Sequence, residues 1–279
     1  MASRIPPQAY FVASAVFHYL GPSFAVLLFA RVDVLGVAWL RIASAAAVFA
    51  LWRRPWRRVR LGRDVVLLGA VFAVMNACFY LAIDRLPLAT VAAIEFVGPV
   101  SLALLGARTG RNLAAVAAAA LGVYLLTHVR FGGHPAGILF AFANAGLFTA
   151  YIVLAHRVSR ASRVDGLAAS MLCAFVFVSP IGLAGAAHAL GDPVALAAGI
   201  GVGVSSSVIP YVFDQLAMAR LARATYALFV ALLPATATAI GVVVLRQLPS
   251  ALGLAGIALV TAGVALHREK PPPGQATPL

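Results

Sequence analysis

The stretch from Leu81 to Gly106 reads LAIDRLPLATVAAIEFVGPVSLALLG, and a related stretch begins 135 positions later. The second copy, from Leu216 to Gly241, reads LAMARLARATYALFVALLPATATAIG. The copies share apolar residues and also an arginine, a threonine and a proline, namely Arg85 with Arg220, Thr90 with Thr225, and Pro99 with Pro234. A repeat displaced by about half of the chain indicates duplication of one structural unit.

The composition is that of a membrane protein. Hydrophobic residues make up 63% of the chain, charged residues 10%, and the mean hydropathy is +0.98. A soluble domain has about 25% charged residues. Apolar runs of about 20 residues recur along the sequence, which is the length that crosses the hydrocarbon core as a helix. A membrane β-barrel would instead show alternating segments of about 10 residues. We therefore predict an all-α membrane protein.

Ten transmembrane helices are predicted, five in each half of the chain. The expected spans are 10–30, 34–52, 64–84, 88–107, 111–129, 136–156, 164–188, 194–218, 223–245 and 250–267. The first five-helix repeat is expected in residues 1–130 and the second in 131–270. Residues 271–279 are rich in proline, and we expect a disordered C-terminal tail there.

Positive charges predict the orientation of these spans, since cytoplasmic loops collect Lys and Arg. The net charge is +13, and its location between apolar runs argues against nucleic-acid binding. Four arginines fall on one side of the predicted membrane, Arg31, Arg85, Arg130 and Arg246. The other side holds Arg4, Arg53, Arg54, Arg57, Arg58, Arg60, Arg63, Arg108, Arg111, Arg157, Arg160, Arg163, Arg220, Arg223, Arg268 and Lys270. Both termini are thus expected in the cytoplasm of a bacterial cell, with the protein in the inner membrane.

Five spans per repeat is an odd number, so the second repeat must enter the membrane upside down. Inverted repeats of this kind occur in many secondary transporters, which place the substrate site between the halves near the midplane. We therefore expect two inverted five-helix repeats around a central cavity.

Ionisable residues inside a span are costly and are functional candidates by default. Arg41 and Glu95 each lie about seven residues into a span that enters from outside, which places both about 10 Å below the outer interface. They can form an ion pair that only orients two helices, or they can line a wet cavity and bind a charged substrate or a proton. His18 shares a helix face with Ser14 and Gly21, and histidine can change charge near physiological pH.

Further polar residues share helix faces inside the spans. They are candidates for lining the same cavity, although Asn and Tyr also serve as ordinary hydrogen-bond partners between helices. These candidates are Asn76 with Tyr80, Asn144 with Tyr151, and Tyr211 with Asp214.

Three prolines inside spans predict bent helices, because proline removes a backbone donor. Pro99 and Pro234 are the repeat-related pair, and Pro210 interrupts the stripe of Tyr211 and Asp214. Cys78 and Cys173 lie in apolar runs and are expected to be small buried residues. The sequence has no P-loop and no metal-ligand cluster, so we expect no cofactor, no bound metal and no ATP hydrolysis. Uphill transport would then use an ion gradient, most simply protons.

Three blocks of the sequence resemble a known family. They are Val37-Ala-Trp-Leu-Arg41, the run from Met75-Asn76 to Gly98-Pro99, and the run from Val208-Ile-Pro210-Tyr211 to Pro234. In these blocks the chain resembles the EamA-type ten-helix members of the drug/metabolite transporter superfamily, and among them the bacterial threonine/homoserine exporters. The resemblance implies proton-coupled efflux of small metabolites by alternating access. Leu233 departs from the pattern, because exporters of this type tend to carry a glutamate before the second-repeat proline.

Taken together, these features predict a secondary active exporter of amino acids of the threonine/homoserine type, and not an enzyme. Its expected partners are a small-molecule substrate, protons and the lipid bilayer, and the expected unit is a monomer. An exporter of hydrophobic drugs or aromatic compounds is the alternative, suggested by the missing glutamate at Leu233. A remote alternative is an intramembrane lipid-modifying enzyme built on Tyr211, Asp214 and the Ser205–Ser207 run.

Overall fold

The computed structural model describes residues 7–98, 109–128, 134–218 and 233–266, and every regular element in these ranges is a helix. The helices of the first half are α1 (Pro7–Leu28), α2 (Val34–Arg53), the short 3-10 turn η1 (Pro55–Arg57), α3 (Arg63–Ile83), α4 (Leu88–Glu95) and α6 (Gly110–His128). Those of the second half are α7 (Pro135–Gly191), α8 (Pro193–Gly203), the π-helix η2 (Val204–Val208), α9 (Ile209–Met218), α11 (Leu233–Leu245) and α12 (Ala251–Leu266). The prediction of an all-α fold is confirmed.

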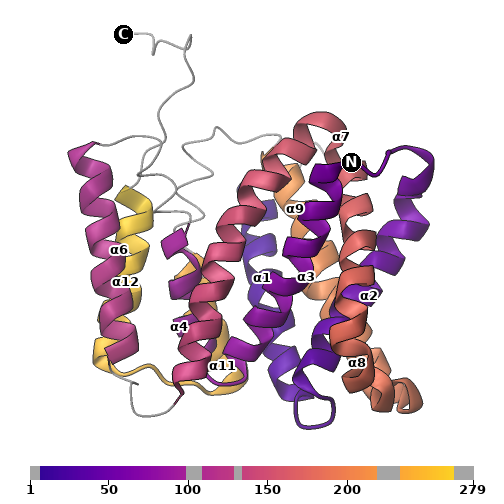
Figure 1. The fold of residues 1–279 in the computed structure, drawn as a ribbon. Helices are drawn as coiled ribbons and strands as arrows, with labels where there is room; N and C mark the ends of the chain where they lie inside the picture. Colours follow the sequence, from indigo (N-terminus) through magenta and orange to yellow (C-terminus); the bar gives the residue numbers. More distant parts are fainter. Residues whose placement is uncertain (1–6, 99–108, 129–133, 219–232, 267–279) are drawn as a thin grey trace.

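Most of the helices run lengthwise through the bundle, side by side (Figure 1). We call the end that holds residues 53–63 the basic end; it is uppermost in Figure 1, where α2 ends and α3 begins. Within the described ranges, five segments are long and apolar enough to cross a membrane, namely Val34–Arg53, Arg63–Ile83, Pro135–Ala155, Val164–Gly191 and Pro193–Phe213. Shorter apolar helices cover Val12–Leu28, Leu233–Leu245 and Ala251–Gly263.

The sixth and seventh predicted spans are not separate helices. They form one helix of 57 residues, α7, in place of the loop expected at 157–163. Residues 156–163, HRVSRASR, contain neither Pro nor Gly, so nothing in their backbone chemistry ends the helix. The prediction treated polar residues as a loop signal, and here that inference was wrong.

α7 nevertheless crosses the bundle twice, because it bends. Gly137 lies against Leu86 at the end of α3, Val158 packs with Val65 at the start of α3, and Gly185 lies against Gly36 at the start of α2. A straight helix of this length would extend about 85 Å. The first limb (Pro135–Ala155) therefore rises to the basic end and the second limb (Val164–Gly191) returns, as the arched ribbon in Figure 1 shows.

The second limb of α7 packs antiparallel to α2. A β-carbon on Gly36 would collide with the backbone of Gly185, so two glycines allow the helices to touch. Farther along, the Trp39 indole donates to Ser179 Oγ at 3.0 Å, and at the basic end Arg53 Nε lies 2.7 Å from Asp165 Oδ1. Helix pairs in membranes pack through small residues and interhelical hydrogen bonds in this way.

Large apolar side chains cover much of the outside of the bundle. Leu139, Val176 and Val243 are among them, each more than 60% exposed. On a protein surrounded by lipid this surface needs no further partner, because hydrocarbon is as apolar as the side chains. The polar residues of interest lie on the inside.

Several predictions fall outside the described residues. They include Pro99, the C-terminal tail 271–279 and the start of the ninth span. Asp214 lies on α9, but the description does not extend to its side chain. Cys78 and Cys173, the two cysteines of the chain, are both free and only partly buried.

Candidate functional site

Arg41 is buried in the centre of the bundle, with 8% of its surface exposed. Its Nε donates to Ser207 Oγ at 2.9 Å, and Nη2 donates to the Ser206 carbonyl at 3.2 Å. The guanidinium also lies over the ring of Tyr80, 5.6 Å from the ring centre. A buried arginine needs such partners, yet none of these three carries a negative charge. The positive charge of Arg41 is thus held in the bundle without a counter-ion in direct contact.

The partners of Arg41 belong to a local irregularity in the chain. Residues Val204–Val208 form a π-helix between α8 and α9, which widens the turn that faces α2. Gly203 brings this turn close to α2, since a β-carbon there would meet the backbone of Arg41 at 2.6 Å. π-turns are rare and occur mostly at functional sites. Here the turn presents a carbonyl and a hydroxyl to one guanidinium.

Glu95 is the last residue of α4 and is 6% exposed. Asn144 Nδ2, from the first limb of α7, donates to Glu95 Oε1 at 3.0 Å. The carboxylate therefore has an amide partner from the other half of the chain. An amide fixes the orientation of a carboxylate but does not neutralise it.

Arg41 and Glu95, both fully described, do not form the ion pair that their matching depths suggested. The guanidinium is instead occupied by the π-helix and the carboxylate by Asn144. They are close enough for their charges to interact, and the charge of Arg41 also acts on His18. The two opposite charges therefore share one buried region while remaining separate.

Among the described residues around these charges, four polar atoms have no hydrogen-bond partner. They are the hydroxyls of Tyr19 and Tyr80 and the Oδ1 atoms of Asn76 and Asn144. All four residues are at most 2% exposed. Leaving a buried polar group unpaired costs about 1–3 kcal/mol, and such groups in a native structure call for an explanation. A polar ligand bound beside Arg41 and Glu95 would supply the missing partners.

Tyr19 is the member of this group that sequence reasoning missed. Its side chain is fully buried, and its ring lies 5.4 Å from that of its neighbour His18 in an edge contact. A tyrosine in an apolar run looks like ordinary packing, and no spacing signal marked it. His18, which the sequence did mark, is only partly buried.

Tyr151 and Tyr211, two other predicted site residues, belong to an aromatic group and not to the cluster of unpaired polar atoms. Both rings contact Phe72, at 5.3 Å and 5.7 Å between ring centres, and Tyr151 stacks on Phe148 at 5.9 Å. Asn76 donates from α3 to the Ala38 carbonyl of α2 at 3.1 Å. It thereby joins the helix that carries Arg41.

The predicted helix-bending prolines have different surroundings. Pro210 directly follows the π-helix, and its carbonyl accepts a hydrogen bond from Ser14 of α1 at 3.3 Å. Pro234 is buried at the second residue of α11. A bend at Pro234 stays a prediction, because the residues before Leu233 lie outside the description.

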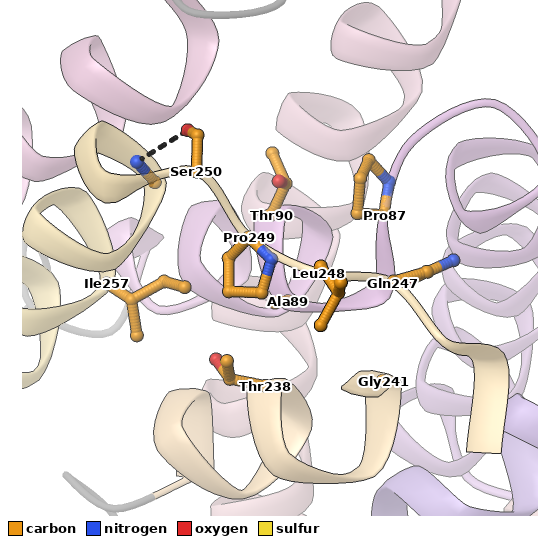
Figure 2. Close-up of a pocket in the computed structure, with 11 residues that line it drawn as sticks. Pro87, Ala89, Thr90, Thr238, Gly241, Gln247, Leu248, Pro249, Ser250 and Ile257 are labelled. Carbon is orange, nitrogen blue, oxygen red and sulfur yellow. Dashed lines mark hydrogen bonds between the residues drawn. The ribbon is translucent and has the colours of Figure 1, made fainter. Parts of the chain in front are cut away.

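A pocket lies between the halves at the end of the bundle opposite the basic end. Its walls come from α4, α11, α12 and the segment that leads into α12 (Figure 2). The lining includes two threonines, Thr90 and Thr238, together with Gln247, whose Oε1 accepts a hydrogen bond from the Leu88 amide at 3.1 Å. Since Thr90 and Glu95 lie on the same short helix, the pocket is about 7.5 Å along the helix axis from the buried carboxylate. Neither Arg41 nor Glu95 is among the residues that line this pocket.

Comparison with known proteins finds similarity to a transporter family. Residues 135–268, nearly half of the chain, match the EamA-like transporter family. It is 29% identical over 238 residues to the threonine/homoserine exporter RhtA of Salmonella typhimurium strain LT2, covering 81% of this chain and 79% of that protein. The corresponding match to RhtA of Escherichia coli K12 is 29% over 240 residues, with the same coverage.

A protein of known crystal structure shares the fold of this EamA-like chain. The two superpose with a TM-score of 0.61 over 93% of this chain and 97% of the other, at 20% sequence identity. The match to EamA-like transporters and the similarity to the RhtA exporters support a membrane transporter and not an enzyme. The helical architecture agrees with the ten-helix layout of the family.

Proposed function

We propose that this EamA-like transporter exports small amino acids of the threonine/homoserine type across the bacterial inner membrane, with its basic end in the cytoplasm. The RhtA relatives support the cargo class, because both are named as threonine/homoserine exporters. The excess of arginine at one end supports the orientation. Both termini then lie in the cytoplasm.

The observation that carries the proposal is the pair of separated, buried, opposite charges, Arg41 and Glu95. An amino acid is itself a pair of separated opposite charges, and leaving water costs it hydration at both ends. A site that offers a cation to one end and an anion to the other offsets that cost. Lipophilic cargo would not require either charge inside the bundle.

In the proposed complex the substrate carboxylate binds Arg41 and the substrate ammonium group binds Glu95. Arginine suits a carboxylate because its planar fork donates two parallel hydrogen bonds. Asn144 keeps the Glu95 carboxylate oriented toward the ammonium group. The unpaired oxygen atoms of Tyr19, Tyr80 and Asn76 are then available to the side-chain hydroxyl of threonine or homoserine.

We further propose that residues 1–130 and 131–270 are inverted copies that rock around this site. The helix pairs support such symmetry, since each contact recurs when the halves are exchanged. α1 packs on η2 and α9 of the second half, as the first limb of α7 packs on α3 of the first. α2 with the second limb of α7, α4 with α11, and α6 with α12 are pairs of equivalent spans. The family match, residues 135–268, covers nearly the whole of the second copy.

Proton antiport is the proposed energy source. Glu95 would alternate between a substrate ammonium group and a proton, because one buried carboxylate cannot favour both ligands at once. A proton entering from the outside would release the amino acid there. The proton would leave Glu95 when that side chain next faces the cytoplasm, which restores the charge that binds substrate.

Aromatic cargo is a second candidate. It is favoured by the group of aromatic rings in contact with one another, formed by Phe72, Phe148, Tyr151 and Tyr211. Leu233 in place of the expected glutamate points the same way. Aromatic amino acids or related compounds would keep the charge contacts and place a ring on this group.

The test is counterflow of labelled threonine, homoserine and phenylalanine in proteoliposomes under an imposed pH gradient. Wild-type protein is expected to move the first two faster than the third, and Glu95→Gln is expected to abolish gradient-driven flux while the protein stays folded. Arg31→Gln, a charge change on an exposed outer arginine, is the matched control. Undiminished gradient-driven flux in Glu95→Gln would remove Glu95 from the mechanism, and a preference for phenylalanine would favour the second candidate.

A further inference from the structure

The connection between α2 and α3 carries more positive charge than helix orientation requires. Residues 53–63 read RRPWRRVRLGR, with six arginines and no acidic residue. The polar segment 157–163 of α7 contains three arginines, and the predicted connection 107–111 contains two. The connection between α7 and α8, residues 188–193, has none. Residues 188–193 are the equivalent connection in the second repeat, so duplication does not account for the six arginines of 53–63. Helix orientation does not account for them either, because other segments at the basic end have fewer.

The connection between α2 and α3 has a defined backbone structure. Arg54 adopts a left-handed conformation with φ 48°, and its amide donates to the Ala50 carbonyl at 3.0 Å, which ends α2. Pro55 is buried and begins the turn η1. Val59 packs against Val65 and its neighbours in a small core at this end. The arginines are consequently displayed from a fixed backbone, so less conformational freedom is lost when they bind a ligand.

The arginines of this loop divide into two groups. Arg53 and Arg58 both contact the carboxylate of Asp165 on α7, at 2.7 Å and 3.8 Å. The others, Arg54, Arg57, Arg60 and Arg63, are exposed, and within the described part of the chain no carboxylate lies in salt-bridge range of them. Four exposed guanidinium groups thus lack a compensating carboxylate, and Arg54, Arg57 and Arg60 are the three that precede α3.

Two tryptophans flank these arginines. Trp52 is 52% exposed and Trp56 is 61% exposed, and the nearby Leu51 and Leu61 are more exposed still. Exposed tryptophan is typical of the interface between acyl chains and headgroups, where its ring and its N–H find different surroundings. The combination of outward arginines and tryptophans at one depth matches the layer in which lipid phosphates lie.

We propose that residues 51–61 form a binding site for anionic phospholipid, with the lipid phosphate held by Arg54, Arg57 and Arg60. A guanidinium group binds a phosphate through two parallel hydrogen bonds. Trp52 and Trp56 then contact the glycerol and upper acyl region of the same lipid. Basic segments beside membrane helices are drawn to anionic leaflets by the same electrostatics. The site requires only that the basic end faces such a leaflet, so it is independent of the cargo proposed above.

The first test uses the delipidated full-length protein in a neutral detergent. Phosphatidylglycerol or cardiolipin is expected to raise the Tm by several degrees, whereas phosphatidylcholine is not. The triple variant Arg54→Gln/Arg57→Gln/Arg60→Gln is expected to lose this shift, and Arg31→Gln, at the opposite end, to keep it. An equal shift with phosphatidylcholine, a shift retained by the triple variant, or the same shift with soluble glycerol phosphate would each overturn the proposal.

A second measurement does not depend on the folding of the triple variant. In proteoliposomes, brominated phosphatidylglycerol is expected to quench the tryptophan emission of the wild type more strongly than brominated phosphatidylcholine at equal mole fraction. Trp52→Phe/Trp56→Phe, which leaves only Trp39, provides the background. Replacement of the three arginines by lysine keeps the charge and is expected to keep part of the preference. Equal quenching by the two lipids in the wild type would exclude the site.

Discussion

Asn144 donates a hydrogen bond of 3.0 Å to Glu95, and this bond connects the first limb of α7 to the end of α4. It is a direct polar contact between the two halves of the chain at a buried charge. Because the other amide atom of Asn144, Oδ1, has no partner, the side chain has an unused acceptor facing the same region. In the proposed complex, Asn144 would bind the substrate and orient the Glu95 carboxylate at the same time.

The first prediction concerns Asn144→Ala. The substitution removes a hydrogen bond to a charged group, worth about 1.5–3 kcal/mol, so substrate affinity is expected to fall about 10- to 100-fold. The measurement is the threonine concentration that gives half of the ligand-induced thermal shift. Ser179→Ala, which removes a hydrogen bond with Trp39 that involves neither Arg41 nor Glu95, is the control and is expected to leave the affinity unchanged.

The second prediction separates charge from geometry at Arg41. Arg41→Lys keeps the positive charge but cannot reproduce the two bonds to Ser206 and Ser207. We expect it to fold, to bind substrate at least tenfold more weakly, and to retain more transport than Arg41→Met. Equal activity of the lysine and methionine variants would mean that the charge of residue 41 has no part in transport. Initial rates of counterflow give the comparison.

The third prediction tests the contact between α2 and the second limb of α7. Gly36→Ala places a methyl group against the Gly185 backbone, and an overpacked helix contact costs about 1–3 kcal/mol. The Tm of the purified protein is expected to fall by several degrees. Gly146→Ala on α7 is the control, because a β-carbon there meets nothing within 4 Å and alanine favours the helix. A Tm of Gly36→Ala at or above that of the control would show that the helices are not in contact.

The fourth prediction concerns the pocket between α4 and α11. In a cysteine-free background, Thr238→Cys is expected to react in intact cells with a membrane-impermeant thiol reagent, because Thr238 lines a pocket at the end proposed to face outward. Ser44→Cys, on a residue that is 8% exposed near the centre of α2, is expected to stay unlabelled. Labelling of Thr238→Cys only after the cells are opened would reverse the proposed orientation.

The reaction rate of Thr238→Cys also tests the hydrogen bond between the Leu88 amide and Gln247 Oε1 beside the pocket. Gln247→Ala removes the acceptor of the Leu88 amide and is expected to increase the rate at which Thr238→Cys reacts. An unchanged reaction rate of a cysteine at a water-exposed site of the same end, such as Arg31→Cys, would show that the reagent itself is not limiting.

The sequence predicted the charges of the site but only part of their surroundings. Arg41 and Glu95 were found because a charge in an apolar run is conspicuous, and Asn144 because it shares a helix face with other polar residues. Tyr19 was not found, because it stands out only through its buried hydroxyl group, for which the structure shows no hydrogen-bond partner among the described residues. The direct pairing of Arg41 with Glu95 was also undecided, because depth along two helices says nothing about their rotation.

The fold was predictable to a similar degree. Where the structure describes a whole predicted span, as for 34–52 and 64–84, hydropathy located it to within a few residues, because the length of a transmembrane helix is fixed by the bilayer. The continuity of α7 was missed, because a polar segment at a membrane surface can adopt either a helix or a loop and its composition does not distinguish them. The residues of the π-helix at Val204–Val208, VSSSV, do not by themselves predict this conformation. The turn contacts the guanidinium group of Arg41, which is distant in sequence.

The unbroken α7 gives the transporter a mechanical link. Asn144 and Asp165 lie on one helix with no break between them, so the residue that bonds Glu95 and the residue that bonds Arg53 belong to the same curved rod. If cargo binds beside Glu95 as proposed, a tilt of the first limb of α7 would be transmitted along this helix to the ion pair of Arg53 and Asp165 at the basic end.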